Sequence, residues 1–413
     1  MAAERALLSR WSSVQHETEL IATVAIGLSA AFVGGFVASR LRLPTIVGYL
    51  LAGIVVGPHT PGFVANRGLA EQLAEIGVIL LMFGVGMHFS VRDLLAVRSV
   101  AVPGGIGQAA VATGVGYAVG RAWGWPGGES LVFGLALSVA STVVLLRSLE
   151  GRGRLRSPEG RIAVGWLLVE DVLMVLALVL LPTLAEPLGG VAGTAGSSSV
   201  ALTVVVTLAK LVGFVALMLV AGTRVIPRML AAVDRTRSRE LFLLAVLAVA
   251  LGIAFGAAEL FDVSVALGAF LAGVVVGGSE HRWRAEELSQ PLQDMFTVLF
   301  FVSIGMLIDP AFLLRNLDRV AVVALLVIVV KSIIALGIVR VLARPSHVGW
   351  TVAVGLAQVG EFSFILVELG RGLGLLSDEA QSLVLAGALV SITVNPFLFR
   401  LLDRRSSGAT RAT

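Results

Sequence analysis

The sequence contains no cysteine among its 413 residues, which excludes disulfide bonds and thiolate chemistry. It has five histidines, none paired at the spacing of a transition-metal site, so no resident metal centre or cofactor is expected. Its glycine-rich segments lack the Lys-Ser/Thr that follows a phosphate-binding loop, and it has no nucleophile elbow. These absences argue against a nucleotide-binding enzyme and against a hydrolase.

Charged residues are also scarce. They make up 14% of the chain, against about 25% in soluble proteins, whereas 57% of the residues are hydrophobic and the mean hydropathy is +0.95. The net charge of +4 comes from arginines in short runs between apolar segments, which is typical of membrane topology and does not indicate nucleic-acid binding. The composition therefore predicts an all-α polytopic membrane protein whose main partner is the lipid bilayer.

Thirteen apolar segments are long enough, or nearly so, to cross a hydrocarbon core of about 30 Å. They are residues 20–39, 43–58, 72–90, 99–120, 128–147, 161–184, 199–223, 239–259, 262–278, 292–308, 318–340, 348–370 and 380–402. Residues 1–19 are polar and carry charges of both signs, which predicts an exposed N-terminal tail. We expect one transmembrane domain at 20–403 and a short cytoplasmic C-terminal tail at 404–413.

The arginines predict the orientation. Most of them lie in the loops that follow odd-numbered spans, as in the group Arg152, Arg154 and Arg156. The loops on the other side contain only Arg67, Arg121, Arg315 and Arg371. By the positive-inside rule, the N-terminus should lie outside and the C-terminus in the cytoplasm of a multi-pass protein of the cell inner (plasma) membrane.

An internal repeat divides the chain. Residues 48–58 read GYLLAGIVVGP and residues 268–278 read GAFLAGVVVGG, with seven of eleven positions identical. Two shorter matches keep nearly the same offset, Gly86-Met87 with Gly305-Met306 and residues 134–136 with 355–357. The offset corresponds to seven spans, an odd number, so the second copy should be inverted. We predict two inverted six-helix repeats joined by a linker span, with crossed broken helices near the membrane midplane.

Two adjacent carboxylates, Glu170 and Asp171, lie in the middle of the span 161–184. An acidic side chain at the centre of a membrane helix costs roughly 2.5–3.5 kcal/mol, so the pair needs a cationic partner, a proton or a bound cation. Adjacent residues point about 100° apart on a helix, which predicts two roles, with one carboxylate pairing with a lysine and the other binding ions. The alternative is that both acids lie at a headgroup interface.

The sequence has only two lysines, Lys210 and Lys331, and both fall inside spans. A desolvated lysine can lose its proton, whereas an arginine in a protein effectively cannot. Lys331 is therefore a candidate supporting charge for the acidic pair. Lys210 lies on the linker span, where snorkelling or helix contact is the favoured interpretation.

The repeat-related spans 128–147 and 348–370 supply further oxygen ligands. The first contains Ser138, Ser141 and Thr142, and the second contains Gln358 and Glu361. Dehydrated hard cations bind oxygens, and broken helices offer free carbonyls beside such hydroxyls. For the hydroxyl residues, a local bond to the backbone of the preceding turn is an equally supported alternative.

Several segments together resemble the Kef-type branch of the cation:proton antiporter-2 family, over nearly the whole chain. They are LPTIVGYLLAGIVVGP (43–58), GVILLMFGVGMHFS (77–90), ALSVASTVVLLRSL (136–149), the acidic pair at 170–171, the segment 239–280, LQDMFTVLFFVSIGMLIDP (292–310) and GLAQVGEFSFIL (355–366). The resemblance implies a homodimer with a dimerisation subdomain and a mobile core subdomain. It also implies exchange of potassium or sodium for protons by an elevator-like movement.

The resemblance also implies roles for single residues. Asp171 matches the ion-binding aspartate, Ser141 and Thr142 the hydroxyls of the first broken helix, Lys331 the core lysine and Glu361 the acid of the second broken helix. Position 170 departs from the family pattern, because potassium-type members resemble Gln-Asp and electrogenic sodium antiporters resemble Asp-Asp. Kef proteins commonly continue into a cytoplasmic nucleotide-binding domain, so a regulatory domain or subunit beyond Thr413 is a further expected partner.

The combined prediction is a secondary antiporter in which Asp171 binds a monovalent cation and a proton in turn, with potassium slightly favoured over sodium. Three alternatives remain open from the residues alone. They are a gated cation channel, an organic-anion or solute symporter on the same inverted-repeat plan, and a non-transporting membrane scaffold, which would leave the buried acids unexplained.

Overall fold

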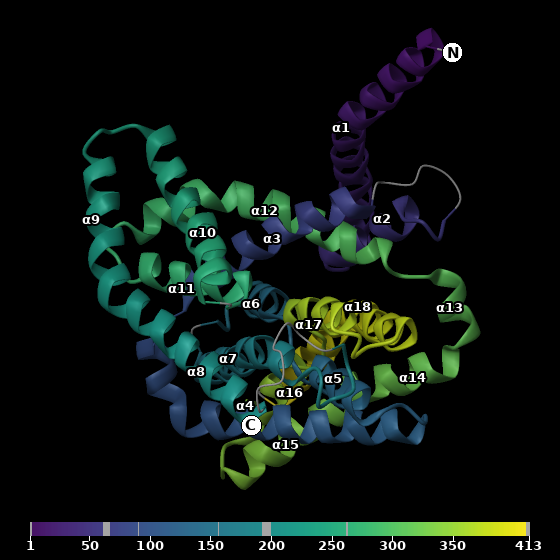
Figure 1. Cartoon of the computed structure of the whole chain (residues 1–413). Helices are drawn as coiled ribbons and strands as arrows, with labels where there is room; N and C mark the ends of the chain where they lie inside the picture. The colour runs from purple at the N-terminus through teal and green to yellow at the C-terminus, as the bar shows by residue number, and fades with distance from the viewer. Residues whose placement is uncertain are drawn as a thin grey trace.

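The computed structural model describes residues 2–60, 67–89, 91–155, 157–191, 200–261 and 263–409, and every regular element in these ranges is a helix (Figure 1). Ser90, Arg156, Ser199, Asp262 and residues 410–413, which belong to predicted spans, loops or the C-terminal tail, lie outside these ranges. The elements are α1 (Ala2–Arg40), α2 (Thr45–Val56), α3 (Arg67–His88), α4 (Val91–Ala122), α5 (Gly127–Ser138), α6 (Thr142–Glu150), α7 (Pro158–Leu184), α8 (Val200–Leu217), η1 (Met218–Gly222), α9 (Thr223–Asp234), α10 (Arg239–Phe261), α11 (Val265–Gly277), α12 (Arg282–Met306), α13 (Pro310–Arg315), α14 (Leu317–Leu325), η2 (Leu326–Val330), α15 (Lys331–Val341), α16 (Ser346–Gly355), α17 (Glu361–Gly372) and α18 (Asp378–Ala409).

Each of the thirteen predicted spans falls on one helix or on two or three consecutive helical elements. In the described ranges, nine helical segments are long and apolar enough to cross a membrane, and α2 and α11 are apolar but shorter. α12 begins at Arg282, before the predicted start of its span, and α1 begins at Ala2, so the residues assigned to an N-terminal tail form the first part of that helix. The all-helical polytopic fold class is confirmed.

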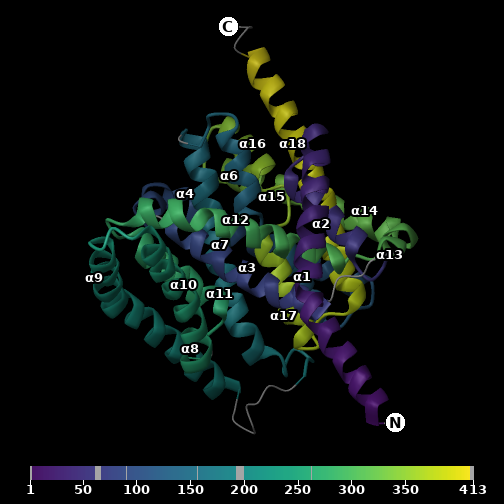
Figure 2. The same cartoon turned by 90° about the horizontal axis from the view of Figure 1, so that it is seen from above.

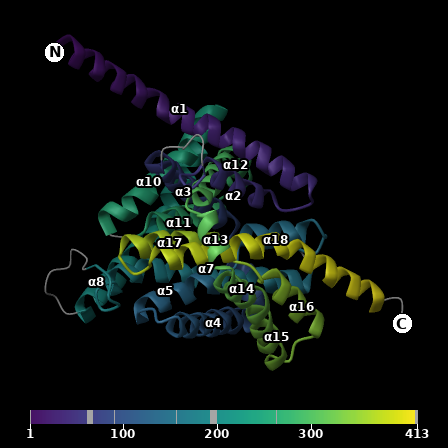
Figure 3. The ribbon, with the colours of Figure 1, turned by 90° about the vertical axis from the view of Figure 1, so that its right-hand side faces the viewer.

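The helices form two bundles (Figures 1 and 2). In the first, α3 packs against α11 and α12, and α2 packs against α1 and α12. In the second, α4 packs against α5 and α7, α15 against α16, and α14 against α18. The chain passes from the second bundle to the first through α8, η1 and α9, which run along one edge of the molecule. Figure 3 shows that α1 and α18 project at opposite ends.

Glycine pairs reveal the internal repeat within the first bundle. A Cβ atom on Gly53 of α2 would lie 2.1 Å from a carbonyl oxygen of α12 and 2.7 Å from the Gly305 Cα. A Cβ atom on Gly273 of α11 would lie 2.1 Å from a carbonyl oxygen of α3 and 3.0 Å from the Gly86 Cα. These are the positions that match in sequence. Each repeat therefore packs its GxxxG-like helix against the partner helix of the other repeat, at a separation that only glycine allows.

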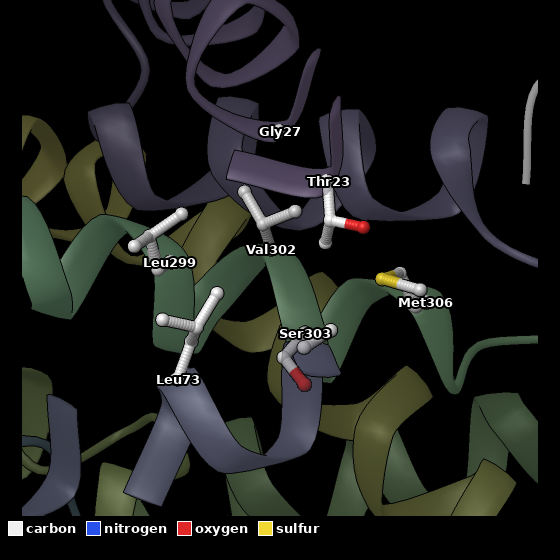
Figure 4. A pocket seen from close by; sticks show the side chains of 8 residues that line it. Thr23, Gly27, Leu73, Leu299, Val302, Ser303 and Met306 are labelled. Atoms are coloured by element: carbon white, nitrogen blue, oxygen red, sulfur yellow. The ribbon is translucent and has the colours of Figure 1, made fainter. Parts of the chain in front are cut away.

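A small cavity lies in this first bundle, between α1, α3 and α12 (Figure 4). Thr23 and Gly27 line it from α1, Leu73 from α3, and Val302 and Ser303 from α12. The predicted acidic residues are on α7 and α17 of the second bundle. The cavity is therefore not the predicted ion site.

The glycine contacts lead to a stability prediction. Gly53→Ala should destabilise the protein by about 1–3 kcal/mol, because the new methyl group meets backbone atoms that cannot turn aside. Gly273→Ala should do the same, since its contact is related to the first by the repeat. Thermal unfolding in detergent measures both effects.

Gly252→Ala on α10 is the matched control, because a Cβ there meets nothing within 4 Å and should leave the melting temperature unchanged or raised. Equal melting temperatures for all three variants would contradict the packing argument.

Candidate ion-binding site

The two adjacent carboxylates lie in the interior of the long helix α7. Ser157 caps the start of this helix, where its Oγ accepts a hydrogen bond from the Gly160 N–H at 3.1 Å, and Pro158 occupies the first turn, where it needs no donor. The helix continues to Leu184, and Glu170 and Asp171 are 0% and 2% exposed. The alternative that these acids lie at a helix end is wrong.

Two chain breaks cross beside this pair. The first separates α5 from α6 at residues 139–141, and the second separates α16 from α17 at residues 356–360. The Gly360 N–H donates to the Val139 carbonyl oxygen at 3.1 Å, so the breaks are in direct contact. A Cβ atom on Gly360 would lie 2.3 Å from the Ala140 carbonyl oxygen, which explains the glycine. The predicted crossed broken helices are confirmed.

Gln358 holds the crossing together. Its Oε1 accepts from the Ser141 N–H at 2.9 Å, and its Nε2 donates to the Ser141 carbonyl oxygen at 3.0 Å. The side chain is fully buried. One amide of the second break therefore satisfies both backbone groups of a residue in the first break, groups that would be expensive to bury without partners.

The two adjacent acids have different surroundings. Both oxygens of Glu170 accept hydrogen bonds, one from Gln108 Nε2 at 2.9 Å and the other from the Ala140 N–H at 3.2 Å. Asp171 accepts a single hydrogen bond on Oδ2, from Thr142 Oγ1 at 2.9 Å, and its buried Oδ1 has no hydrogen-bond partner among the described residues. Asp171 therefore has a buried oxygen without a hydrogen-bond partner among the described residues, whereas each oxygen of Glu170 already accepts one hydrogen bond.

Glu361 adds a third buried carboxyl group. It is 1% exposed, and its side-chain oxygens make no hydrogen bond of standard geometry in the part of the chain that the structure describes, although the Ser141 hydroxyl and the backbone N–H groups of Thr142 and Val143 lie close to them. It lies close enough to Asp171 for the two carboxylates to repel each other. Glu361 is the first residue of α17 and Thr142 is the first residue of α6. The positive ends of two helix dipoles therefore lie beside these acids.

Lys331 contacts the crossing at the second break. It follows directly on the π-helical turn η2, and its Nζ donates to the Gln358 carbonyl oxygen at 3.0 Å. Lys331 and Glu170 interact through space, but the described residues show no ion pair within 4 Å between their side chains. The expectation of a direct Lys331–carboxylate contact is therefore corrected, because the Lys331 Nζ donates to the Gln358 carbonyl oxygen. Its role as a supporting charge stays a prediction.

The predicted hydroxyl ligands divide into two kinds. Thr142 contacts Asp171, as described above. Ser141 Oγ accepts from the Val144 N–H at 3.2 Å and so caps α6, and Ser138 Oγ donates to the Leu135 carbonyl oxygen at 2.7 Å. Ser138 thus makes the expected bond to the preceding turn, whereas Ser141 instead caps the turn that follows it. Their role as ion ligands stays a prediction.

Sequence reasoning missed three buried polar residues at the crossing. Gln108 of α4 contacts Glu170, Ser391 Oγ of α18 accepts from the Val359 N–H at 3.3 Å, and Asn395 Nδ2 donates to the Val354 carbonyl oxygen at 2.8 Å. Each is a polar residue inside an apolar span, and this pattern could have identified it from the sequence. Lys210, in contrast, is exposed on α8, and its snorkelling or helix contact stays a prediction.

The buried charges do not balance. Among the residues whose burial the structure describes, the buried ionisable side chains are Glu170, Asp171, Glu361 and Lys331. With all four ionised, the site would carry a net charge of −2, which is strongly unfavourable inside a membrane protein. The described residues contain no cluster of three or more histidine and acidic side chains able to hold a resident metal. The site thus needs protons or a monovalent cation to compensate its charge.

Inverted repeats, crossed half-helices and buried carboxylates at the crossing define a secondary transporter of the membrane. The chain belongs to the sodium/hydrogen exchanger transmembrane family, whose profile matches residues 27–402. It is thus a multi-pass membrane protein of the cation/proton antiporter class and not an enzyme.

The chain is similar to the putative cation/proton antiporter YbaL of Escherichia coli K12, with 52% identity over 393 residues that cover 95% of this chain and 70% of that protein. It is 32% identical to the K(+) efflux antiporter 4 of Arabidopsis thaliana over 396 residues, 95% of this chain and 66% of that protein. Its fold resembles that of the sodium proton antiporter MjNhaP1 of Methanocaldococcus jannaschii. The TM-score is 0.70 at 15% identity, covering 92% of this chain and 96% of that one.

The Gln358 contacts generate a prediction. Gln358→Ala leaves the Ser141 N–H and carbonyl buried without partners, at a cost of about 1–3 kcal/mol for each group. We expect a lower melting temperature and faster amide hydrogen exchange in peptides that cover 139–142 and 356–360.

Gln293→Ala is the control, because Gln293 of α12 is only part-buried and donates to Ser289 on its own helix. Unchanged exchange at both breaks in Gln358→Ala would show that the amide does not hold the crossing.

Proposed function

We propose that this protein is a secondary active antiporter that exchanges a monovalent cation for protons by alternating access. The observation that carries the proposal is the excess of buried acid at the crossing, where three carboxyl groups face a single lysine. A cation or a proton at Asp171 reduces this imbalance, and the two should therefore exclude each other. Mutual exclusion at one site, combined with exposure of that site to one side of the membrane at a time, couples the two fluxes.

Asp171 is the proposed ion ligand because its Oδ1 has no hydrogen-bond partner in the described ranges. Thr142 Oγ1 donates a hydrogen bond to the other oxygen of this carboxylate, and the Glu361 carboxyl group is nearby. Carbonyl oxygens of the first break and the hydroxyls of Ser141 and Ser138 are further candidate ligands. Such a set of hard oxygens suits a dehydrated sodium or potassium ion.

Glu170, Lys331 and Gln358 have supporting roles in this proposal. Glu170 is fully hydrogen-bonded, and Lys331 supplies the only positive side chain among the buried residues described. Lys331 acts on Glu170 through space and binds the Gln358 carbonyl, which connects its charge to the crossing. Movement of the half-helices during transport would then change the field at both acids.

Potassium is the favoured cation, slightly ahead of sodium. Three relatives from Arabidopsis thaliana that cover 92% or more of this chain bear the name K(+) efflux antiporter, at 30–32% identity. The glutamate at 170 matches neither family pattern, so the ion and the charge moved per cycle depend on this residue.

The assembly is also part of the proposal. Helices α1 and α10 carry large exposed apolar side chains, including Phe32, Phe36, Phe255 and Leu260, which suit lipid or a second copy in a homodimer. Opposite projection of α1 and α18 supports termini on opposite sides of the membrane (Figure 3). The arginine distribution along the sequence then favours an external N-terminus and a cytoplasmic C-terminus in the inner membrane. The greater length of the relatives supports a regulatory domain or subunit as a further partner.

Replacement of Asp171 tests the site. Asp171→Asn keeps the shape of the side chain but cannot bind a cation by charge, so we expect cation-driven proton flux in proteoliposomes to fall to the background. Glu259→Gln is the control, because this carboxylate is exposed on α10 and should leave the flux unchanged. Full exchange by Asp171→Asn would overturn the assignment.

Competition between ions predicts a pH dependence. When the pH falls, protons occupy more of the shared site, so the apparent KM for the cation should rise by up to about tenfold per pH unit. A pH-sensitive dye in proteoliposomes measures this for potassium, sodium and lithium, with the membrane potential clamped and unclamped. Cation flux that a pH gradient cannot drive uphill would instead indicate a gated channel, and competition by small organic acids would indicate a symporter.

A further inference from the structure

Gln108 of α4 is a buried polar residue that contacts the candidate site, and the proposed function gives it no role. It is 0% exposed, and its Nε2 donates to Glu170 Oε1 at 2.9 Å. Its own Oε1 is buried and has no hydrogen-bond partner among the described residues. An amide with one bonded end and one free end is able to turn over.

The glycines before Gln108 bring α4 close to the acids. A Cβ atom on Gly104 would lie 2.2 Å from the Trp166 ring, and one on Gly105 would lie 2.8 Å from Val169. Trp166 and Val169 belong to the turn of α7 that leads into Glu170. The sequence Pro-Gly-Gly-Ile-Gly-Gln at 103–108 therefore lets two helices approach closely, and Gln108 extends from that contact onto the carboxylate.

We propose that Gln108 is a positioning residue that holds Glu170 in both of its protonation states. When Glu170 is ionised, it accepts from the Gln108 Nε2, as the structure shows. When Glu170 is protonated, its hydroxyl donates to the Gln108 Oε1 after the amide has turned by half a rotation. The inference rests on the proposed antiport and deepens it, because it keeps Glu170 at the crossing while the charge there changes.

This arrangement differs from that of the other carboxyl groups. Asp171 and Glu361 each have an unpartnered oxygen, as an ion site requires, whereas Glu170 has a neutral partner suited to either state. A lysine in place of Gln108 would stabilise only the ionised form. A hydrogen bond to a charged group is about twice as strong as a neutral one, so loss of the amide should affect ionised Glu170 more than protonated Glu170.

The test uses the full chain in proteoliposomes and compares Gln108→Met with wild type. Methionine keeps the volume but removes both hydrogen-bonding groups, so we expect a roughly tenfold slower exchange near neutral pH. We also expect the pH of half-maximal exchange to move upward, because the ionised form loses the stronger bond. Thr113→Val, five residues further along α4 at a buried hydroxyl without a described partner, should change neither quantity.

A double-mutant cycle shows whether Gln108 acts through Glu170. In the Glu170→Gln background, Gln108→Met should cause no further shift in the pH profile. An equal shift in both backgrounds, or no shift from Gln108→Met in the wild-type background, would overturn the proposal. Melting temperatures in detergent identify a folding defect, and Gln108→Glu, which keeps the length and a polar group, then replaces Gln108→Met. It too should move the profile upward, and a wild-type profile would overturn the proposal.

The outcome is separable from that of the antiport proposal. If wild type exchanges ions, Asp171→Asn does not, and the Gln108 variants match wild type, then only the role of Gln108 is wrong. If Asp171→Asn exchanges ions normally, the antiport site itself is wrong, whatever the Gln108 variants do.

Discussion

The structure depends on the contact between two interrupted helices. At each break the backbone loses the hydrogen bonds of a helix, in a region where no water or headgroup can replace them. The side-chain amide of Gln358 hydrogen-bonds to both the N–H and the carbonyl oxygen of Ser141, and the backbone N–H of Gly360 donates to the Val139 carbonyl oxygen. Each break thus satisfies part of the other, and side chains of neighbouring helices satisfy further backbone groups. The position of an ion site at the crossing would therefore be fixed by residues of both repeats.

Much of this arrangement could be predicted from the sequence, because strong physical constraints leave visible patterns. A bilayer requires long apolar spans, and close helix contact requires glycines such as Gly53 and Gly273, so both the spans and the repeat were recognisable. The acids at 170 and 171 were conspicuous because burial of charge is costly. What could not be predicted was which partner each acid takes. That choice depends on side-chain direction and on distances of a few ångströms between helices far apart in sequence.

Lys331 illustrates this limit. Its scarcity as a residue type and its depth in a span indicated a role near the acids, and it is indeed buried beside the crossing. The structure nevertheless shows Lys331 bonded to the Gln358 carbonyl and not to Glu170, whose oxygens accept from an amide of α4 and a freed backbone N–H. Neither donor is a charged group, so counting charges along the sequence could not have identified them. The positions of neutral hydrogen-bond donors therefore determine which buried carboxylate oxygens are left without a partner.

The two repeats provide the same supports but different chemistry. In the second repeat, Ser391 of α18 accepts from the Val359 N–H at its break, and in the first repeat Glu170 of α7 accepts from the Ala140 N–H. These helices are the last spans of their repeats, so a neutral hydroxyl in one repeat and a carboxylate in the other each accept a backbone N–H at the break. The fourth span of each repeat likewise supplies one long polar side chain, Gln108 or Lys331, to the crossing. Because the backbone supports are alike and only the charged groups differ, the crossing can keep its shape when the acids change their charge. The asymmetry of charge, and not of fold, is therefore the basis for proposing an ion site beside Asp171 of α7.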